Sequence, residues 1–553
     1  MSNKNFGGNR VMLIGIDGAT FNLIQPLVEK NRLPFFQKIM NQGSYGVLKS
    51  DLPLNSAANW TSLFTGKNPG KHNIYDFFEF DKSSYQPKLI TNQSLKSELI
   101  WNVATSHDLQ TIVLNAPVAS QPEPLNGIMV SGFLTPSDQR YAYPEDIAKE
   151  LRSENYLVDS GFAKNLEPKQ YFAQIMKTLE KQEKTFGALV EKHPWDLAIL
   201  TLNALGKAQH DFWREEELIE SLYVQIDTFL QSLYQRFGED TYFVVVSHHG
   251  FKSVTKKFFV NEWLWELGLL EKIITIKKSR LTDIYDVIFN QSEEKENPVT
   301  NFFAKTGITK DNIRSILPVF VSEMLKRIIP WEIKKHFPME YLDIEWSKTQ
   351  AYFVSTNVQV INIKLIGREP QGTGEHSEAY ENLRNKIISE LYRLKDPYTL
   401  ENVVDEIYRK EDLFRGDNLE MAPDIIFVPH EYNYFLDPNK RTSRLFIGSA
   451  NDNYDPIYSY HEPSGIFAIA GPNIRKGKKL SNINIYDVAP TVLHLLEKPI
   501  PEEMDGEVLY RIFEEADEFI YKFRPQFLPS EEYFSLFPSS HFAQQPTLHP
   551  VYP

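Results

Sequence analysis

Two adjacent histidines end an otherwise apolar run in FVVVSHHG, which covers residues 243–250. The β-branched run is typical of a buried strand, so His248 and His249 stand where that strand ends. Adjacent imidazoles at such a position can be metal ligands, general bases or ordinary turn residues. A carboxylate stands in a similar place in VMLIGIDG, where Asp17 follows an apolar run and precedes a glycine. The sequence therefore offers imidazoles and a carboxylate at strand ends.

A serine with the potential to act as a nucleophile lies in LPLNSAANWTSLFTGKNPG, residues 52–70. Ser56 opens a short stretch that is compatible with a helix and that Gly66 and the following Asn-Pro-Gly would stop. A hydroxyl at a helix N-terminus faces unpaired backbone N–H groups, which suits phosphate binding and the stabilisation of an alkoxide. Serine is also one of the commonest helix-capping residues, so capping is the alternative interpretation.

Composition excludes several classes of site. The 553-residue chain has no cysteine, which rules out disulfides, thiolate catalysis and cysteine-based metal sites. A net charge of -14 disfavours nucleic acid polymers and anionic lipid as partners, but leaves room for a cationic or metal-loaded pocket that binds one small anion. The polar N-terminus lacks a secretory pattern, and no apolar run approaches the roughly 20 residues of a membrane span. We therefore expect a soluble cytoplasmic protein, and the sequence leaves its oligomeric state open.

Further apolar runs predict the strands that must position these side chains. They read TIVLNAP, DLAILTLN, QVINIKL, DIIFVP and GIFAIAG, and helix-like segments lie between many of them. Alternating buried strands and helices predict an α/β fold whose central, mostly parallel sheet is flanked by helices. Ligands of such sheets bind beyond the carboxyl ends of the strands, where Asp17, Asn203 and the histidine pair fall.

The pattern also predicts boundaries within the chain. Residues 1–10 read as a flexible N-terminus, and residues 11–258 and 346–515 as the core. Residues 259–345 are helical in period and read as an insertion. Residues 516–553 form a tail rich in aromatic residues and proline, which we expect to pack on the surface of the folded domain.

Eight blocks in one order carry a resemblance to a known family. They are VMLIGIDGAT, NSAANWTSLFTGKNPGKHNIYDF, AQHDFW, SHHG, INIKLIGREPQG, APDIIFVP, YHEPSGIFAIAGPNI and IYDVAPTVLHLLEKPIPEEMDGEVL. From about Val11 to Phe513 the chain resembles the alkaline phosphatase superfamily, and within it the type I phosphodiesterase/nucleotide pyrophosphatase branch, often labelled phosphohydrolase/phosphomutase. The resemblance implies an alkaline-phosphatase-like fold with a helical insertion.

The resemblance also implies a site. In the family, two divalent metals, usually zinc, flank a serine or threonine nucleophile, and two such cations stabilise the attacking and leaving oxygens of a phosphoryl displacement. Carried over to this chain, it assigns the nucleophile to Ser56 and a donor to a phosphoryl oxygen to Asn59. The metal ligands that it implies are Asp17, Ser56, His210, His248, His249 and His461.

Two positions depart from the family pattern. Gly206 stands where the family has an aspartate four residues before His210, and His248 replaces the aspartate of an Asp-His-Gly turn. Imidazole is still a good zinc ligand, so we expect one divalent metal site, with zinc, and a degraded second site for which Asn203 or a nearby carboxylate would have to compensate. One hypothesis is that the ammonium of Lys207 takes over the charge of the missing metal; a solvent-facing helix lysine is the alternative.

The resemblance predicts a metal-dependent phosphoester hydrolase, similar to phosphodiesterases and nucleotide pyrophosphatases, that acts on a small phosphorylated substrate through a phosphorylated Ser56. Transfer to another hydroxyl would make it a phosphoryl transferase or mutase. Because two family carboxylates are missing, a pseudoenzyme that binds a phosphorylated ligand or a partner is the other alternative. A sulfatase is disfavoured, because that branch of the superfamily needs a Pro-x-Arg signature after its nucleophile and none follows Ser56.

Overall fold

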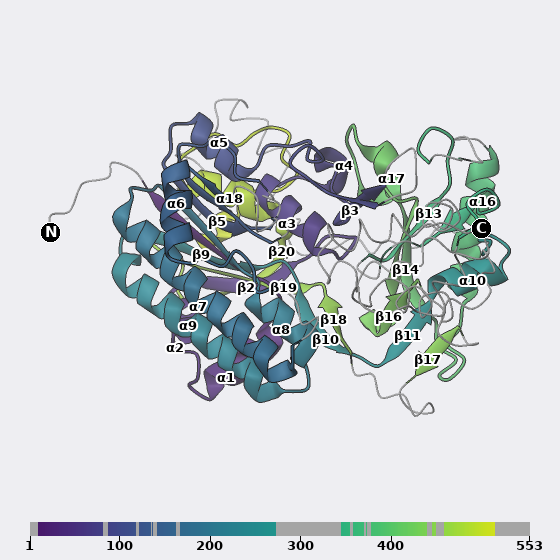
Figure 1. Ribbon diagram of the computed structural model, residues 1–553, viewed down its shortest axis with the longest axis horizontal. Coiled ribbons are helices and arrows are strands. Elements are labelled where there is room, and N and C mark those ends of the chain that lie inside the picture. The colour runs from purple at the N-terminus through teal and green to yellow at the C-terminus, as the bar shows by residue number, and fades with distance from the viewer. Residues whose placement is uncertain are drawn as a thin grey trace, which may run out of the picture.

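The chain folds into two lobes that lie side by side (Figure 1). The computed structural model describes residues 9–80, 87–117, 121–133, 135, 141–161, 166–272, 344–353, 355, 358–369, 372, 378–438, 445–448 and 458–514. The predicted tail over residues 516–553 and most of the predicted insertion lie outside these residues.

A nine-stranded sheet forms the centre of the larger lobe. All its strands except β19 and β7 run in the same direction, which confirms the predicted α/β fold with a mostly parallel sheet. In spatial order they are β20 (Lys478–Asn484), β2 (Ser44–Lys49), β19 (Ser464–Ala470), β9 (Thr241–Ser247), β1 (Arg10–Ile16), β8 (Leu197–Leu202), β5 (Thr111–Ala116), β6 (Gly127–Ser131) and β7 (Ala142–Tyr143).

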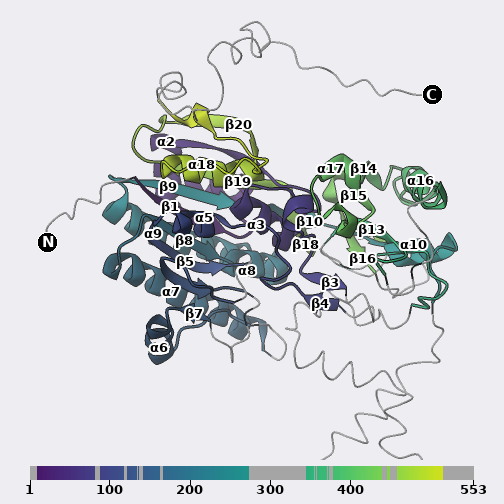
Figure 2. The same ribbon diagram turned by 90° about the horizontal axis from the view of Figure 1, so that it is seen from above.

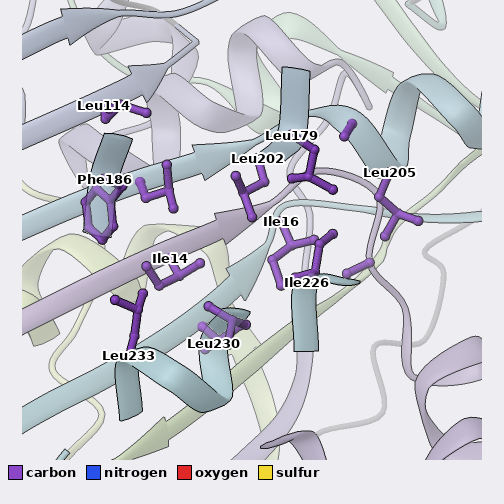
Figure 3. Close-up of a cluster of buried hydrophobic side chains, with 14 of the residues drawn as sticks. Ile14, Ile16, Leu114, Leu179, Phe186, Leu202, Leu205, Ile226, Leu230 and Leu233 are labelled. Atoms are coloured by element: carbon purple, nitrogen blue, oxygen red, sulfur yellow. The ribbon is translucent and has the colours of Figure 1, made fainter. Parts of the chain in front are cut away.

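Helices cover both faces of this sheet because alternate strand residues point to opposite sides. Met12 and Ile14 of β1 belong to the core beneath one helical layer, shown in part in Figure 3, whereas Val11 and Leu13 pack into the core on the other face. The first layer contains α1 (Phe21–Glu29), α2 (Pro34–Gln42), α6 (Glu145–Ser153), α7 (Pro168–Lys192), α8 (Ala204–Phe212) and α9 (Glu216–Phe237). The second contains α3 (Ser56–Thr65), α5 (Ile100–Ser106) and α18 (Val488–Leu495).

The smaller lobe has its own sheets and its own apolar core. One sheet has the order β12 (Ala351–Tyr352), β13 (Val360–Ile363), β15 (Ile425–Pro429) and β14 (Val404–Arg409), and the other has the order β16 (Tyr434–Asp437), β11 (Lys256–Phe259) and β17 (Phe446–Gly448). Its helices within the described residues include α10 (Val260–Glu266), α16 (Glu378–Arg393) and α17 (Lys410–Leu413).

This lobe corrects one sequence interpretation. QVINIKL and DIIFVP do form strands, as β13 and β15, but these strands pair with each other in the smaller lobe and not with the central sheet. The reason is that an apolar run specifies that a strand will be buried without specifying its partner.

An antiparallel strand pair joins the two lobes (Figure 2). Strand β10 (Gly250–Val254) leaves the end of β9 and pairs with β18 (Tyr458–Glu462), which leads back into β19. The short elements α4 (Pro69–His72), β3 (Phe78–Phe80) and β4 (Pro87–Leu89) lie near the junction, and 3-10 turns cover Leu419–Met421, His430–Tyr432, Ile485–Asp487 and Tyr510–Ile512. None of the helices in the described part of the chain is both long enough and apolar enough to cross a membrane.

Candidate metal centre and nucleophile

Two neighbouring strand ends bring a carboxylate and two imidazoles together. Strands β1 and β9 pair in parallel, so Asp17, which follows β1, emerges beside the residues that follow β9. Asp17 Oδ1 lies 3.7 Å from Nδ1 of His248 and 3.5 Å from Nε2 of His249. Ligands bound at about 2.1 Å in a tetrahedron lie roughly 3.4 Å apart, so these separations suit one zinc-sized cation. Among the described residues, Asp17, His248 and His249 form the one group of three metal-binding side chains whose ligand atoms are close enough to share an ion.

Ser56 stands at the first position of α3, directly beside this cluster. The side-chain oxygen of Asn55 caps the helix by accepting from the backbone N–H groups of Ala57 and Ala58. The capping residue is therefore Asn55, which leaves the Ser56 hydroxyl available, and its Oγ lies 3.3 Å from Nε2 of His249. The helix ends at Gly66, whose φ of 66° is left-handed and favours glycine. These bounds confirm the helix predicted from the sequence.

The chemistry of the cluster favours a cation. His248 is fully buried between Trp60 and His249, and neither of its ring nitrogens has a hydrogen-bond partner in the described structure; the same is true of Asp17 Oδ1. Buried polar atoms without partners are costly, and a bound ion is one arrangement that would satisfy Asp17 Oδ1 together with a ring nitrogen of His248. His249 Nδ1 lies 3.1 Å from the carbonyl oxygen of Gly250, which assigns the ring proton to Nδ1 and leaves the Nε2 lone pair facing Ser56 and Asp17.

Burial sets the protonation of these groups. Burial lowers the pKa of both His248 and His249 well below the usual value, so both imidazoles are neutral and able to act as ligands. Burial also raises the pKa of Asp17 to about 7, and the charge of nearby Lys207 opposes that shift. The Asp17 side chain is still 21% exposed, so the centre opens to solvent at this carboxylate.

A second histidine pair adjoins the first cluster. His210 of α8 and His461 of β18 face each other with their Nε2 atoms 3.2 Å apart, and His461 stacks on His249 with ring centroids 3.8 Å apart. Burial lowers the pKa of His461 to about 3. The four histidines of the site therefore form one chain of contacting rings. Within the described residues, no carboxylate lies close enough to His210 and His461 to complete a group of three ligands.

Gly206 explains why the second pair lacks a carboxylate neighbour. A Cβ atom built at this position would lie 2.6 Å from Asp17 Oδ2 and 2.9 Å from Asp17 Cγ, closer than real Cβ atoms come to other atoms. The carboxylate of Asp17 thus occupies the space that a side chain at position 206 would need.

Lys207 is buried and is not a solvent-facing helix lysine. Its Nζ lies 2.6 Å from Asp159 Oδ1 and also donates to Ser160 Oγ at 3.2 Å and to Gly161 O at 3.3 Å. Asn203 donates to the other oxygen of Asp159 at 3.0 Å. Both side chains therefore hold the loop at residues 159–161 over α8, and the Lys207 charge is largely neutralised by Asp159.

Asn59 is fully buried and engaged with the backbone. Its Oδ1 accepts from Asp51 N–H at 2.8 Å, and its Nδ2 donates to the carbonyls of Pro53 and Asn55 at 3.0 Å each. This geometry favours a role in shaping the loop before Ser56 over the expected donation to a phosphoryl oxygen.

Asp76 was missed by sequence reasoning. Its Oδ1 accepts from Asn55 Nδ2 at 2.9 Å and from Phe77 N–H at 2.7 Å, which fixes the orientation of the capping amide beside Ser56. Gln359, which precedes β13, accepts from Leu54 N–H at 3.1 Å. The only signal in the sequence was an aspartate shortly after the nucleophile segment, and neither contact is visible without the fold.

Comparisons with known proteins agree with this architecture. The family described as type I phosphodiesterase / nucleotide pyrophosphatase matches residues 11–456. No curated protein sequence matches the chain. Phosphonoacetate hydrolase from Sinorhizobium meliloti, in complex with phosphonoformate, has a similar structure with a TM-score of 0.53 and 14% identity, over 88% of this chain and 95% of that one. The fold is therefore that of an alkaline-phosphatase-like protein.

Two further structures are similar over most of the chain. Murine ectonucleotide pyrophosphatase/phosphodiesterase 5, an inactive variant in complex with AMP, has a TM-score of 0.47 and 14% identity, over 91% of this chain and 98% of that one. The human protein of the same name has a TM-score of 0.46 and 14% identity, over 92% and 99%.

Proposed function

Because the chain belongs to the type I phosphodiesterase/nucleotide pyrophosphatase family, we propose that it is a metal-dependent phosphoester hydrolase that acts through Ser56. The observation that carries the proposal is the position of Ser56 Oγ, 3.3 Å from His249 Nε2, beside buried atoms of Asp17 and His248 that have no hydrogen-bond partner among the described residues. Zinc is the proposed metal, because two neutral imidazoles and a carboxylate are a donor set that zinc enzymes use.

The proposed ligands are Asp17, His248 and His249, with Ser56 or a solvent molecule in the fourth position. A divalent cation held there would supply positive charge beside the Ser56 hydroxyl and the phosphoryl oxygens of the substrate. The Nδ1–H group of His249 donates to Gly250 O. This hydrogen bond holds the ring with its Nε2 lone pair directed toward the proposed centre.

The residues of α3 perform the phosphoryl chemistry in this proposal. The start of α3 places the positive end of the helix dipole beside a phosphoryl group at Ser56, while the Ala57 and Ala58 N–H groups remain engaged by the Asn55 side chain. Ser56 Oγ loses its proton and forms a bond to phosphorus while the bond from phosphorus to the leaving oxygen breaks, and the departing alcohol takes up a proton. Water then attacks the phosphorylated Ser56, which releases the phosphate product and restores the hydroxyl.

Asp76 acts as a positioning residue in this scheme. Asp76→Ala should reduce kcat by about 10- to 100-fold with little change in KM, because the Asn55 amide loses its acceptor and the start of α3 is no longer fixed. Asp76→Asn should recover most of this loss, because an amide oxygen still accepts from Asn55. Steady-state kinetics on bis(4-nitrophenyl) phosphate at equal metal content checks this, and equal kcat values for the two variants would contradict it.

The centre is proposed to hold one tightly bound metal per chain. Gly206→Asp restores the carboxylate that family members carry, yet its Cβ would collide with Asp17 Oδ2. We therefore expect this variant to bind less than one zinc, since Asp17 must leave the centre. Elemental analysis of purified protein measures the count. Gly187→Asp on α7, where a Cβ meets nothing within 4 Å, is the matched control and should keep one zinc. Two tightly bound zinc ions in the wild type would contradict this prediction.

The function itself is tested on a panel of phosphate diesters, pyrophosphates and monoesters with zinc-loaded protein. We expect zinc-dependent release of alcohol from diesters, and a phosphorylated peptide containing Ser56 in acid-quenched samples analysed by mass spectrometry. Zinc binding without turnover on any substrate would reject the enzyme and favour a protein that only binds phosphorylated ligands.

A further inference from the structure

One face of helix α8 contacts the turn that carries Asp17 (residues 16–19, the Asp17 turn). Gly206 and Gln209 stand three residues apart in α8, so they lie on the same face of the helix. At Gly206 the helix leaves room for Asp17 Oδ2, since a Cβ atom there would lie 2.6 Å from this oxygen. At Gln209 the side chain reaches the following residue of the turn, because its Nε2 donates to Gly18 O at 2.9 Å. The two helix residues therefore contact neighbouring groups of the Asp17 turn.

The Asp17 turn is closed by one backbone hydrogen bond. Ala19 N–H donates to Ile16 O at 3.3 Å, which makes Asp17 and Gly18 the two central residues of a four-residue turn. Gly18 has a φ of 80°, which favours glycine, and a Cβ atom at this position would lie 2.6 Å from Gln209 Nε2. The absence of a side chain at position 18 therefore lets the Gln209 amide approach the backbone of the turn.

Gln209 is itself held firmly in α8. The residue is fully buried, so its hydrogen bond to Gly18 O is shielded from water. Its backbone carbonyl accepts from Ser459 Oγ at 2.5 Å, which ties α8 to β18. The next residue, His210, contacts His461 of the same strand. Gln209 thus connects the Asp17 turn to the two elements that carry the second histidine pair.

The far end of the loop has its own anchors. Thr20 N–H donates to the hydroxyl of Tyr223 at 3.2 Å, and Thr20 Oγ1 donates to Glu462 Oε1 at 3.3 Å. These contacts fix the start of α1, which Thr20 caps. Within the part of the chain that the structure describes, Gln209 is the one side chain that forms a hydrogen bond with residues 17–19. This contact therefore restrains the half of the loop that carries Asp17.

We propose that Gln209 is a positioning residue of the metal centre and holds the Asp17 carboxylate where it can bind a cation together with His248 and His249. This inference rests on the proposed function, because it takes Asp17 as a metal ligand. The Asp17 side chain is 21% exposed, whereas both histidines are buried. Asp17 is therefore the ligand that can turn into solvent when its turn is released, and Gln209 opposes this movement.

Gln209→Leu tests the inference by removing the donor at similar side-chain volume. We expect the zinc affinity, measured by competition with a chromophoric chelator, to fall by about 10- to 100-fold, the usual effect of losing a contact that orients a ligand. The visible absorption of the cobalt(II)-substituted protein should also change, because it reports the number and geometry of the ligands. Unchanged zinc affinity in Gln209→Leu overturns the inference.

Gln182→Leu on α7 is the matched control. Gln182 is also fully buried, and its Nε2 likewise donates to a backbone carbonyl, Val158 O, at 3.0 Å. Each substitution removes one buried hydrogen bond, so we expect similar decreases in the Tm of the metal-free proteins, but a loss of zinc affinity in Gln209→Leu alone. A lower Tm in Gln209→Leu with full zinc affinity indicates a purely structural role and overturns the inference, as do equal losses of affinity in both variants.

A second variant and the wild type complete the test. Should Gln209→Leu fail to fold, Gln209→Met removes the same donor on a more adaptable side chain, and its zinc affinity decides. If the wild type binds zinc but hydrolyses no ester, the proposed function fails and the comparison of affinities still decides the role of Gln209. If the zinc-loaded wild type is active and Gln209→Leu binds zinc equally well, the inference fails and the function stands. A wild type that binds no divalent metal overturns both.

Discussion

Ser56→Ala is expected to lower the rate of diester hydrolysis by at least about a thousandfold while the protein keeps its fold and its zinc. The alanine removes the Oγ that lies 3.3 Å from His249 Nε2, whereas Asp17, His248 and His249 stay in place. The start of α3 should persist, since Asn55 and not Ser56 caps it. The measurements are kcat/KM on bis(4-nitrophenyl) phosphate and zinc content by elemental analysis.

Ser56→Thr is the matched control for this prediction. Threonine keeps a hydroxyl on the same carbon and should retain measurable turnover, together with a phosphorylated peptide in quenched samples. Equal rates in wild type and Ser56→Ala would remove Ser56 from the reaction, whatever the zinc content of the two proteins.

Removal of the metal is expected to have a comparable effect. Dialysis against a chelator should abolish turnover, and added zinc should restore it. Asp17→Asn should weaken zinc binding by at least about a hundredfold, because the carboxylate is the one charged ligand of the proposed centre and changes even beyond the ligands cost 10- to 100-fold.

Thermal unfolding gives a readout of this centre that does not depend on activity. Zinc at about 100 times its dissociation constant should add roughly 2.7 kcal/mol to the free energy of unfolding of the wild type and correspondingly raise its Tm. The same zinc concentration should shift the Tm of Asp17→Asn much less. Equal shifts in both proteins would show that Asp17 is not a ligand.

The strands of the central sheet were predictable because each is a short, uninterrupted apolar run, which is typical of a strand buried on both faces. VMLIGI, TIVLNAP, LAILTL, FVVVS and GIFAIA each became a strand of one sheet. The proximity of Asp17 to the histidine pair also followed, since parallel neighbours end at the same edge. The helix at Ser56 was marked by the Asn-Ser start and the glycine stop.

Other features depend on contacts between distant segments and were not predictable. Lys207 is paired with Asp159, which lies 48 residues earlier in the chain, and no local pattern links the two. The Asn59 side chain is hydrogen-bonded to the backbone of residues 51–55, because that loop folds back over α3. A pocket between the lobes is lined by Asp76 and Tyr352, which lie far apart in the sequence, so it exists only in the folded chain.

The strand pair that joins the lobes has a mechanical consequence. His249 directly precedes β10, and His461 lies within β18, where it is paired with Phe251. The strand pair between the lobes therefore also carries residues of the proposed metal centre. Any rotation of the smaller lobe about this ladder would shift the stacked rings of His249 and His461, and with them the geometry of the proposed metal ligands.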